Sequence, residues 1–389
     1  MAKDKNIGGR YGGQIHRYTS VQRSDIAQRR LAAQRLTGAP FADATEVVRA
    51  QGAVQAQDYG GAKWALALRC PDATDSVVEQ AITDGRIVRT HVLRPTWHFV
   101  DPSDIRWLLR LTAQRVIARM APYSRQLELD ADTFRRSNAA VTRALRDGRQ
   151  VTRKELGDVL KRERIRTETP RLAHLLMRAE LDGIVCSGAR QGKEFTYALL
   201  EECVAPARSL DGDEALLELT RRYFSTRGPA TPRDFAWWSG LTTADAKRGV
   251  QMAGSELHHE EIDGTSYWFT ESAAPSANLS PIAHLLPNYD EYFIGYRDRS
   301  AIGQRVKASK SANTSALTAH VLEVDGQIVG GWKRTVKRTA AVIDLYPIVR
   351  LSASERDAVL VAAARHGEFL GLPVEPRWAK TSRAARASK

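Results

Sequence analysis

The sequence has few of the features that mark secreted or membrane-bound proteins. Its 389 residues include only three cysteines, which are too few and too scattered for a disulfide framework and form no Cys-x-x-Cys pair. No apolar run approaches the roughly 20 residues that a membrane span requires. The first 30 residues hold neither the apolar core nor the small-residue cleavage site of a secretory signal. We therefore expect a protein of the reducing cytoplasm with no membrane partner.

Motifs for several common chemistries are also missing. The nine histidines form no His-x-x-x-His pair, and no group of cysteines and histidines has the spacing of metal ligands. His258 and His259 are adjacent on an expected strand, where neighbouring side chains point to opposite faces. Neither the phosphate loop G-x-x-x-x-G-K-[ST] nor the G-x-S-x-G nucleophile motif occurs. We expect no metal and no cofactor.

Positive charge is concentrated at the two ends and in one internal stretch. The net charge is +13, but residues 1–30 and 377–389 together carry ten of these charges and leave only +3 for the body. Residues 299–322 hold four basic side chains, many small polar groups and no acid. That composition suits contacts with the phosphate oxygens of a nucleic acid, although a flexible surface loop has the same composition.

The middle of the chain predicts a repeated unit of helices followed by a hairpin. Residues 151–165 read as a helix opened by a capping box at Thr152 and Glu155. A second amphipathic helix follows at 171–183, and 184–199 reads as strand, turn and strand. Helix, turn, helix and hairpin is the order of a winged helix.

The same order occurs twice more. Downstream, helices are predicted at 215–228, 231–240 and 242–254, before a hairpin around Asp263-Gly264. Upstream, a helix at 75–85 precedes strands within 86–100. We therefore predict an α+β protein with about three tandem winged helices. The expected units are 20–130, 131–205 and 206–274.

The C-terminal part has a different pattern. Residues 275–376 alternate in short β-type runs around Asp325-Gly326 and end in a helix capped at Ser352 and Glu355. We predict a β-rich, barrel-like module there. The basic tail at 377–389 is expected to be disordered.

The predicted recognition helices are poor readers of DNA sequence. The helix at 171–183 has few long polar side chains, and that at 242–254 offers only Lys247, Arg248 and Gln251. These helices are better suited to packing the array. Binding through DNA shape and backbone is favoured over sequence-specific control.

The stretch "AVQAQDYGG", residues 53–61, places Gln55 and Gln57 two positions apart. On an extended segment they share a face, so their carboxamides could hold one water. Spacing alone favours a structural reading, in which they cap a helix or join a buried polar network. Asp58 could assist electrostatically, but a helix cap is the simpler role.

Neutral glutamines suit a reaction whose leaving group needs little help. Alkylation of guanine at N7 or adenine at N3 makes the base cationic and weakens its glycosidic bond. The transition state resembles an oxocarbenium ion, as in glycoside hydrolysis. Positioning a water then suffices without a strong general acid.

Several blocks together resemble the AlkZ-like family of bacterial DNA glycosylases. "VQAQD" matches the family's Gln-x-Gln signature, and similar blocks are "VLRPTWHFVDPSDIRWLL" at 92–109, "LLPNYDEYFIGYRDRS" at 285–300 and "DGQIVGGWKR" at 325–334. The resemblance covers about residues 20–375. It implies tandem winged helices and a β-barrel-like domain in a C-shaped arrangement, with a concave face that binds double-stranded DNA.

The resemblance also implies an activity. It predicts a monofunctional, monomeric glycosylase that hydrolyses the N-glycosidic bond of N7-alkylated purines and unhooks interstrand crosslinks, as self-resistance enzymes of antibiotic producers do. Gln55 and Gln57 would position the attacking water. No lysine lies at the motif, so lyase chemistry is not expected. The enzyme would reach the nucleoid through its DNA substrate.

Other site assignments rest on charge and on these blocks. Trp97 is expected in the core, while Arg297 and Arg299 either pair with Asp290 or Glu291 or contact the DNA backbone. A second hypothesis, a non-catalytic winged-helix regulator or damage sensor, is less consistent with the weak recognition helices. The expected DNA-binding residues are Arg94, His98, Lys307, Lys310, Lys333 and Arg334.

Overall fold

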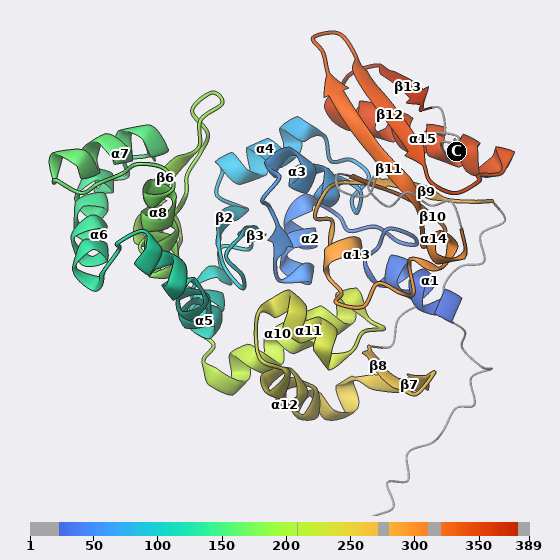
Figure 1. Cartoon of the computed structure of the whole chain (residues 1–389), viewed down its shortest axis with the longest axis horizontal. Coiled ribbons are helices and arrows are strands. Elements are labelled where there is room, and N and C mark those ends of the chain that lie inside the picture. Colours follow the sequence, from blue (N-terminus) through green and yellow to red (C-terminus); the bar gives the residue numbers. More distant parts are fainter. Residues whose placement is uncertain (1–22, 208, 271–279, 310–319, 380–389) are drawn as a thin grey trace, which may run out of the picture.

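The computed structural model describes residues 23–207, 209–270, 280–309 and 320–379. Helices and strands are mixed throughout, which confirms the α+β class (Figure 1). Lys310 and most of the basic tail lie outside the described residues. The helix α1 (Arg23–Ala33) leads into three successive groups of helices and strands, and an open sheet follows them.

The first group, unit 1, carries the glutamine motif on a three-stranded sheet. Its short first strand pairs with its last strand, which gives the order β1-β3-β2. In chain order its elements are α2 (Ala44–Gln51), β1 (Val54–Gln55), α3 (Tyr59–Ala67), α4 (Asp75–Thr83), β2 (Val88–His91) and β3 (Trp97–Val100).

Unit 2 repeats that sequence of elements after the long helix α5 (Ile105–Gln126). Its sheet has the equivalent order, β4-β6-β5. The predicted capping box at Thr152 and Glu155 is confirmed, because each side chain bonds the other's backbone. The elements are α6 (Ala131–Leu145), β4 (Val151–Thr152), α7 (Arg153–Arg162), α8 (Arg171–Leu181), β5 (Val185–Ser187), β6 (Thr196–Leu199) and α9 (Leu200–Cys203).

Unit 3 has the same order but reduces its first strand to one bridge, between Ala230 and Trp268. The predicted hairpin turn at Asp263-Gly264 is confirmed, with φ of 50° and 70°. The elements are α10 (Gly212–Arg227), α11 (Pro232–Ser239), α12 (Thr243–Ala253), a 3-10 turn (Gly254–Glu256), β7 (His258–Ile262) and β8 (Thr265–Phe269).

The C-terminal module is an open five-stranded sheet, so the prediction of a barrel-like module was wrong. Its order is β13-β12-β11-β10-β9, with β9 and β13 at opposite edges. The helix α15 packs on the sheet and covers apolar side chains that closure into a barrel would otherwise enclose. The elements are β9 (Ala283–Leu286), α13 (Glu291–Ile294), α14 (Gln304–Ala308), β10 (His320–Val324), β11 (Gln327–Val336), β12 (Ala341–Pro347), α15 (Ala353–Leu370) and β13 (Val374–Trp378).

The last strand also changes one predicted boundary. β13 pairs in parallel with β12 and includes Arg377 and Trp378, which the sequence pattern had placed in the tail. Trp378 is half-buried and packs against the core of the module. The ordered module therefore extends beyond residue 376.

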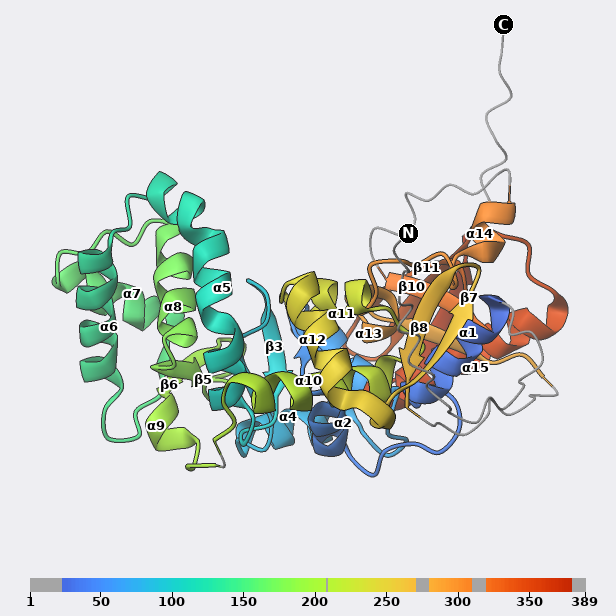
Figure 2. The same ribbon diagram turned by 90° about the horizontal axis from the view of Figure 1, so that it is seen from below.

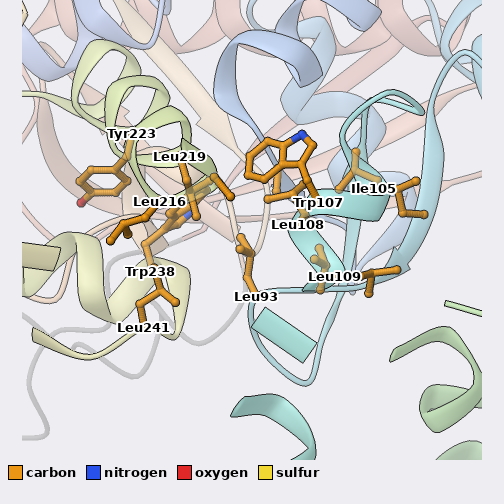
Figure 3. Packing of buried hydrophobic residues seen from close by; sticks show 14 of the residues in the cluster. Leu93, Ile105, Trp107, Leu108, Leu109, Leu216, Leu219, Tyr223, Trp238 and Leu241 are labelled. Carbon is orange, nitrogen blue, oxygen red and sulfur yellow. The ribbon is translucent and has the colours of Figure 1, made fainter. Parts of the chain in front are cut away.

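Unit 2 and the C-terminal sheet lie at opposite ends of the molecule, with units 1 and 3 between them (Figures 1 and 2). One apolar cluster joins unit 1, α5 and unit 3. It includes Leu93, Trp107, Leu216 and Trp238 (Figure 3). Because this core is shared, the two units are fixed relative to each other around the motif.

Two features are absent from the described residues. No helix there is long and apolar enough to cross a membrane. No three His, Cys, Asp or Glu side chains in that part of the chain gather as metal ligands would. The cysteines are free, although the Sγ atoms of Cys186 and Cys203 are 3.0 Å apart.

Candidate functional site

The two glutamines lie at the junction between β1 and α3, in different environments. Gln55 ends the strand opposite His98 and is only 8% exposed. Gln57 lies in the bend that follows and is exposed. The two carboxamides are therefore not equivalent, since one is held in the protein and the other faces outward.

The backbone of the motif is fixed at successive residues. The N–H of Gln55 donates to Glu291 Oε1 at 3.0 Å, and the N–H of Ala56 donates to the carbonyl of Trp97 at 2.7 Å. The carbonyl of Ala56 accepts from Arg89 Nε at 3.2 Å. Asp58 caps α3 by accepting from Gly61 N at 3.1 Å, which confirms the simpler of its two expected roles.

The paired glycines let the C-terminal module approach the motif. A Cβ on Gly60 would lie 2.8 Å from Arg334 Nη2, and one on Gly61 would lie 2.5 Å from Asp58 Oδ2 and 3.2 Å from Pro287 Cβ. Any larger residue would push these groups away. Arg334, which we expected to bind DNA, is therefore half-buried directly beside the motif.

Arg94 fixes the orientation of the Gln55 side chain. Its Nη2 donates to Gln55 Oε1 at 3.0 Å. Arginine has no acceptor atom, so the oxygen of the amide must face Arg94 and the Nε2 hydrogens must point elsewhere. Burial lowers the pKa of Arg94, an effect that Glu291 opposes and Arg227 reinforces.

The loop that carries Arg94 has a strained backbone. Leu93 has a φ of 62°, which is costly for a residue with a Cβ. Its carbonyl rests against Gly240 of unit 3, where a Cβ would lie 2.3 Å from that oxygen. Leu93 is itself buried in the shared core. Packing between units 1 and 3 thus holds Arg94 over Gln55.

A buried ion pair lies on the other side of the motif. Arg227 and Glu291 are both 0% exposed, with Arg227 Nη2 2.8 Å from Glu291 Oε2. The same carboxylate oxygen accepts from Trp238 Nε1 at 2.8 Å. Arg227 also lies over the Trp238 ring, 4.2 Å from its centroid. These groups come from unit 3 and from α13 of the C-terminal module.

His98 does not lie on the surface, which corrects its predicted role. Its side chain is 0% exposed, and Nδ1 bonds the carbonyl of Thr96 at 2.9 Å. Burial, reinforced by Arg94, holds its pKa well below the usual value, so the ring is neutral. β3 is the central strand of its sheet and is buried on both faces, which removes His98 as a direct contact to DNA. Trp97 is half-buried and donates to Glu180 Oε1 at 3.3 Å.

The remaining basic candidates are distributed over the C-terminal module. Lys307 is exposed on α14, and Lys333 is exposed on β11, next to Arg334. Arg299 is half-buried, with Nε bonded to the carbonyl of Phe293 at 2.7 Å. Lys310 lies outside the described residues.

The carboxylates expected to pair with Arg297 and Arg299 have other partners. Asp290 pairs with Arg69, with 2.9 Å between Nη2 and Oδ1, and Glu291 pairs with Arg227. The sequence patterns gave no sign that Glu291 is a neighbour of the motif. It is 236 positions from Gln55, and neither spacing nor composition connects the two.

The chain is similar to known proteins over most of its length. The chain is 25% identical over 341 residues to the interstrand DNA cross-link repair glycosylase of Streptomyces sahachiroi, covering 82% of this chain and 90% of that protein. The fold is similar to the solved structure of the Streptomyces sahachiroi DNA glycosylase AlkZ, with a TM-score of 0.73 at 21% identity, covering 92% of this chain and all of that one. The model of the DNA glycosylase AlkZ-like family matches residues 48–369. The chain therefore belongs to the DNA glycosylase AlkZ-like family.

Proposed function

We propose that this protein is a monofunctional DNA glycosylase that hydrolyses the N-glycosidic bond of N7-alkylated purines. The observation that carries the proposal is the rigid Gln55-Ala56-Gln57 segment, whose first amide is oriented by Arg94 and whose second faces outward. The named activity of the Streptomyces relative supports extending the substrates to interstrand crosslinks. The protein would act as a monomer on double-stranded DNA.

The two amides hold the water through different hydrogen bonds. With its oxygen taken by Arg94, Gln55 donates from Nε2 to the water oxygen. The exposed Gln57 accepts a water hydrogen through Oε1. One lone pair of the water then remains free to attack C1′ of the deoxyribose. Neither group is a strong base, and none is required for this leaving group.

The reaction balances without a general acid. The bond between C1′ and the alkylated base breaks, and its electron pair neutralises the cationic purine. The water oxygen bonds to C1′, and its surplus proton passes to solvent. Holding the water within attacking distance supplies much of the rate. The buried carboxylate of Glu291 offsets the positive charge of Arg94 and Arg227 beside the motif.

We propose that units 1 to 3 are winged helices used for packing and for contact with the DNA backbone. Their shared element order supports this assignment. In unit 2 the would-be recognition helix α8 is mostly buried, and in unit 3 Arg248 of α12 is paired with Asp213. These helices have little left to read bases, which disfavours a sequence-specific regulator.

A concave face between the modules would hold the duplex in a C-shaped protein. The β11–β12 hairpin projects beyond the rest of the sheet in Figure 1 and carries the exposed Lys333 and the 53% exposed Val336. Val336 lies beside the exposed Lys337 and Arg338 of the turn, and basic side chains next to an apolar one suit insertion into a groove. Lys307, Lys333 and Arg334 would neutralise phosphates.

The activity is tested by incubating the protein with duplex DNA that carries N7-methylguanine or an N7-linked crosslink. Alkali then cleaves the strand at each abasic site, and a denaturing gel measures the products. We expect cleavage well above that of a buffer control. If neither lesion gives cleavage above the control, the enzymatic proposal is wrong.

The phosphate contacts are tested by the salt dependence of binding. Affinity for duplex DNA should fall steeply between low and moderate salt, because each phosphate contact releases a counterion. Replacing Lys333 by alanine should reduce the slope by about one counterion. A salt-independent affinity would contradict the assignment of this surface.

A further inference from the structure

Glu291 places its carboxylate at the motif although it belongs to the C-terminal module. One oxygen, Oε1, accepts from the backbone N–H of Gln55 at 3.0 Å. The other, Oε2, accepts from Arg227 Nη2 at 2.8 Å and from Trp238 Nε1 at 2.8 Å. The side chain is 0% exposed. One carboxylate thus joins β1, α10, α11 and α13.

Arg227 extends this contact along the same stretch of backbone. Its Nη1 donates to the carbonyl of Gln51 at 3.1 Å, and its Nη2 donates to that of Ala53 at 3.2 Å. Together, Arg227 and Glu291 bind three backbone groups within residues 51–55. Both ends of the segment that enters the motif are therefore fixed by one ion pair.

The position of β1 explains why such a contact is needed. β1 is an edge strand, paired on one side with β3. The open edge of an edge strand leaves backbone N–H groups without strand partners. The Gln55 N–H meets a buried carboxylate, which gives a stronger bond than a neutral acceptor. This bond fixes the direction in which the Gln55 side chain leaves the strand.

Stability alone does not account for a pair of this kind. Burying two charges is costly, and an apolar replacement of equal volume is often as stable. In some proteins a buried polar or ionic group fixes a geometry at the cost of stability. The geometry here is that of Gln55, whose amide is also held by Arg94.

We propose that Glu291 is a positioning residue of the glycosylase reaction, which acts by fixing the Gln55 backbone from a separate module. The inference rests on the function proposed above. The backbone of Gln55 is then fully fixed only when the C-terminal module, which carries Glu291, packs against unit 1. Glu291 itself does not touch the water or the DNA.

The substitution Glu291→Gln tests this proposal with almost no change of shape. An amide has only one oxygen, and Arg227 and Trp238 both require an acceptor. The oxygen will face those donors, which turns the NH2 group toward the Gln55 N–H and breaks that contact. A small misplacement of Gln55 is expected to lower kcat about 100-fold. KM for lesion DNA should stay nearly unchanged, because no DNA contact is lost.

Glu323→Gln is the matched control. Glu323 is also 0% exposed, lies in the same module and accepts from a backbone N–H, that of Gly326. Its partner is His284, at 2.6 Å between Nδ1 and Oε2. Both variants should lower the melting temperature. Only Glu291→Gln should lower kcat at a temperature where both proteins are folded.

Amide hydrogen exchange separates this proposal from the proposed function. Exchange of the peptide that covers residues 52–58 should become faster in Glu291→Gln and remain unchanged in Glu323→Gln. A wild type without excision would overturn the glycosylase proposal, and this exchange would still show whether Glu291 fixes the backbone of Gln55. If Glu291→Gln folds poorly, Arg227→Lys provides the test, because it keeps the charge but loses the bond to Ala53. Equal kcat and equal exchange in the positioning variant and the control would overturn the inference.

Discussion

Units 1 and 2 have the same sheet but join its first strand to the next helix differently. In unit 2, Thr152 pairs with Thr196 in the sheet and is at once the N-cap of α7. In unit 1, Gln55 occupies the equivalent place opposite His98, but the cap is Asp58, three residues later. The glutamine motif therefore occupies an extension of the junction that unit 2 lacks.

Unit 3 shows that the direct junction is the common one. Ala230 forms the bridge to β8, and Thr231 follows at once as the N-cap of α11, in a capping box with Asp234. In units 2 and 3 the helix thus starts at the end of the strand with a capping box, whereas in unit 1 extra residues separate the strand from the helix. The candidate site therefore lies at the junction of unit 1, where the helix cap is three residues beyond the end of the strand.

The largest expected effect comes from the side chains in this extension. Replacing Gln55 or Gln57 by alanine should lower the single-turnover excision rate about 100-fold, because the water loses one of its two holders. Folding and DNA affinity should remain, as measured by thermal unfolding and by binding to lesion DNA. The control is Lys154→Ala in α7 of unit 2, which is exposed and pairs with Asp158 on the same helix. Normal excision by both glutamine variants would show that the site is elsewhere.

The caps offer a smaller and more selective comparison. Removing the side chain of Asp58 or of Thr152 should cost about 1 kcal/mol of stability in each case, because each satisfies a free N–H at a helix start. Denaturant unfolding measures this loss. Only Asp58→Ala should also slow excision, since Asp58 fixes the bend that holds Gln57. Equal excision rates of the two variants would show that the cap at Asp58 does not affect the glutamine motif.

The smallest expected effect is on the pH dependence of stability. His98 of unit 1 occupies the place that Thr196 occupies in unit 2, and only the histidine can titrate. The pKa of buried His98 is held well below its usual value, so the unfolded chain binds a proton more readily below about pH 6.5. The stability that neutral His98 contributes is present above this pH and is lost as the pH falls. His98→Thr should therefore reduce the loss of unfolding free energy between pH 7.5 and 5.5. An unchanged pH dependence would contradict the neutral, buried state.

Local signals in the sequence predicted much of the fold. Capping residues such as Thr152 and turns such as Asp263-Gly264 act on neighbouring backbone, so their effect is visible in a few letters. Whether the C-terminal sheet stays open or closes into a barrel could not be predicted from such local signals. Alternation identifies strands, but whether β9 meets β13 depends on how α15 covers the sheet.

The site could be predicted from the sequence only in part. The spacing of Gln55 and Gln57 suggested a shared role, and Arg94 lay in a recognisable block. The structure adds that Arg94 orients Gln55 and that Glu291 binds its backbone. Such contacts cross between modules, so they follow from packing and have no local signature. His98 was misplaced because β3 is the central strand of its sheet and is buried on both faces, which a short run of residues does not reveal.

We propose that this protein hydrolyses the glycosidic bond of an alkylated purine at the junction of unit 1. The most direct test measures released N7-methylguanine by mass spectrometry, together with the abasic sites left in the duplex. We predict equal amounts of free base and abasic site with the wild type, and neither above background with the variant that lacks both Gln55 and Gln57 side chains. Release of base by that variant at the wild-type rate would contradict the claim.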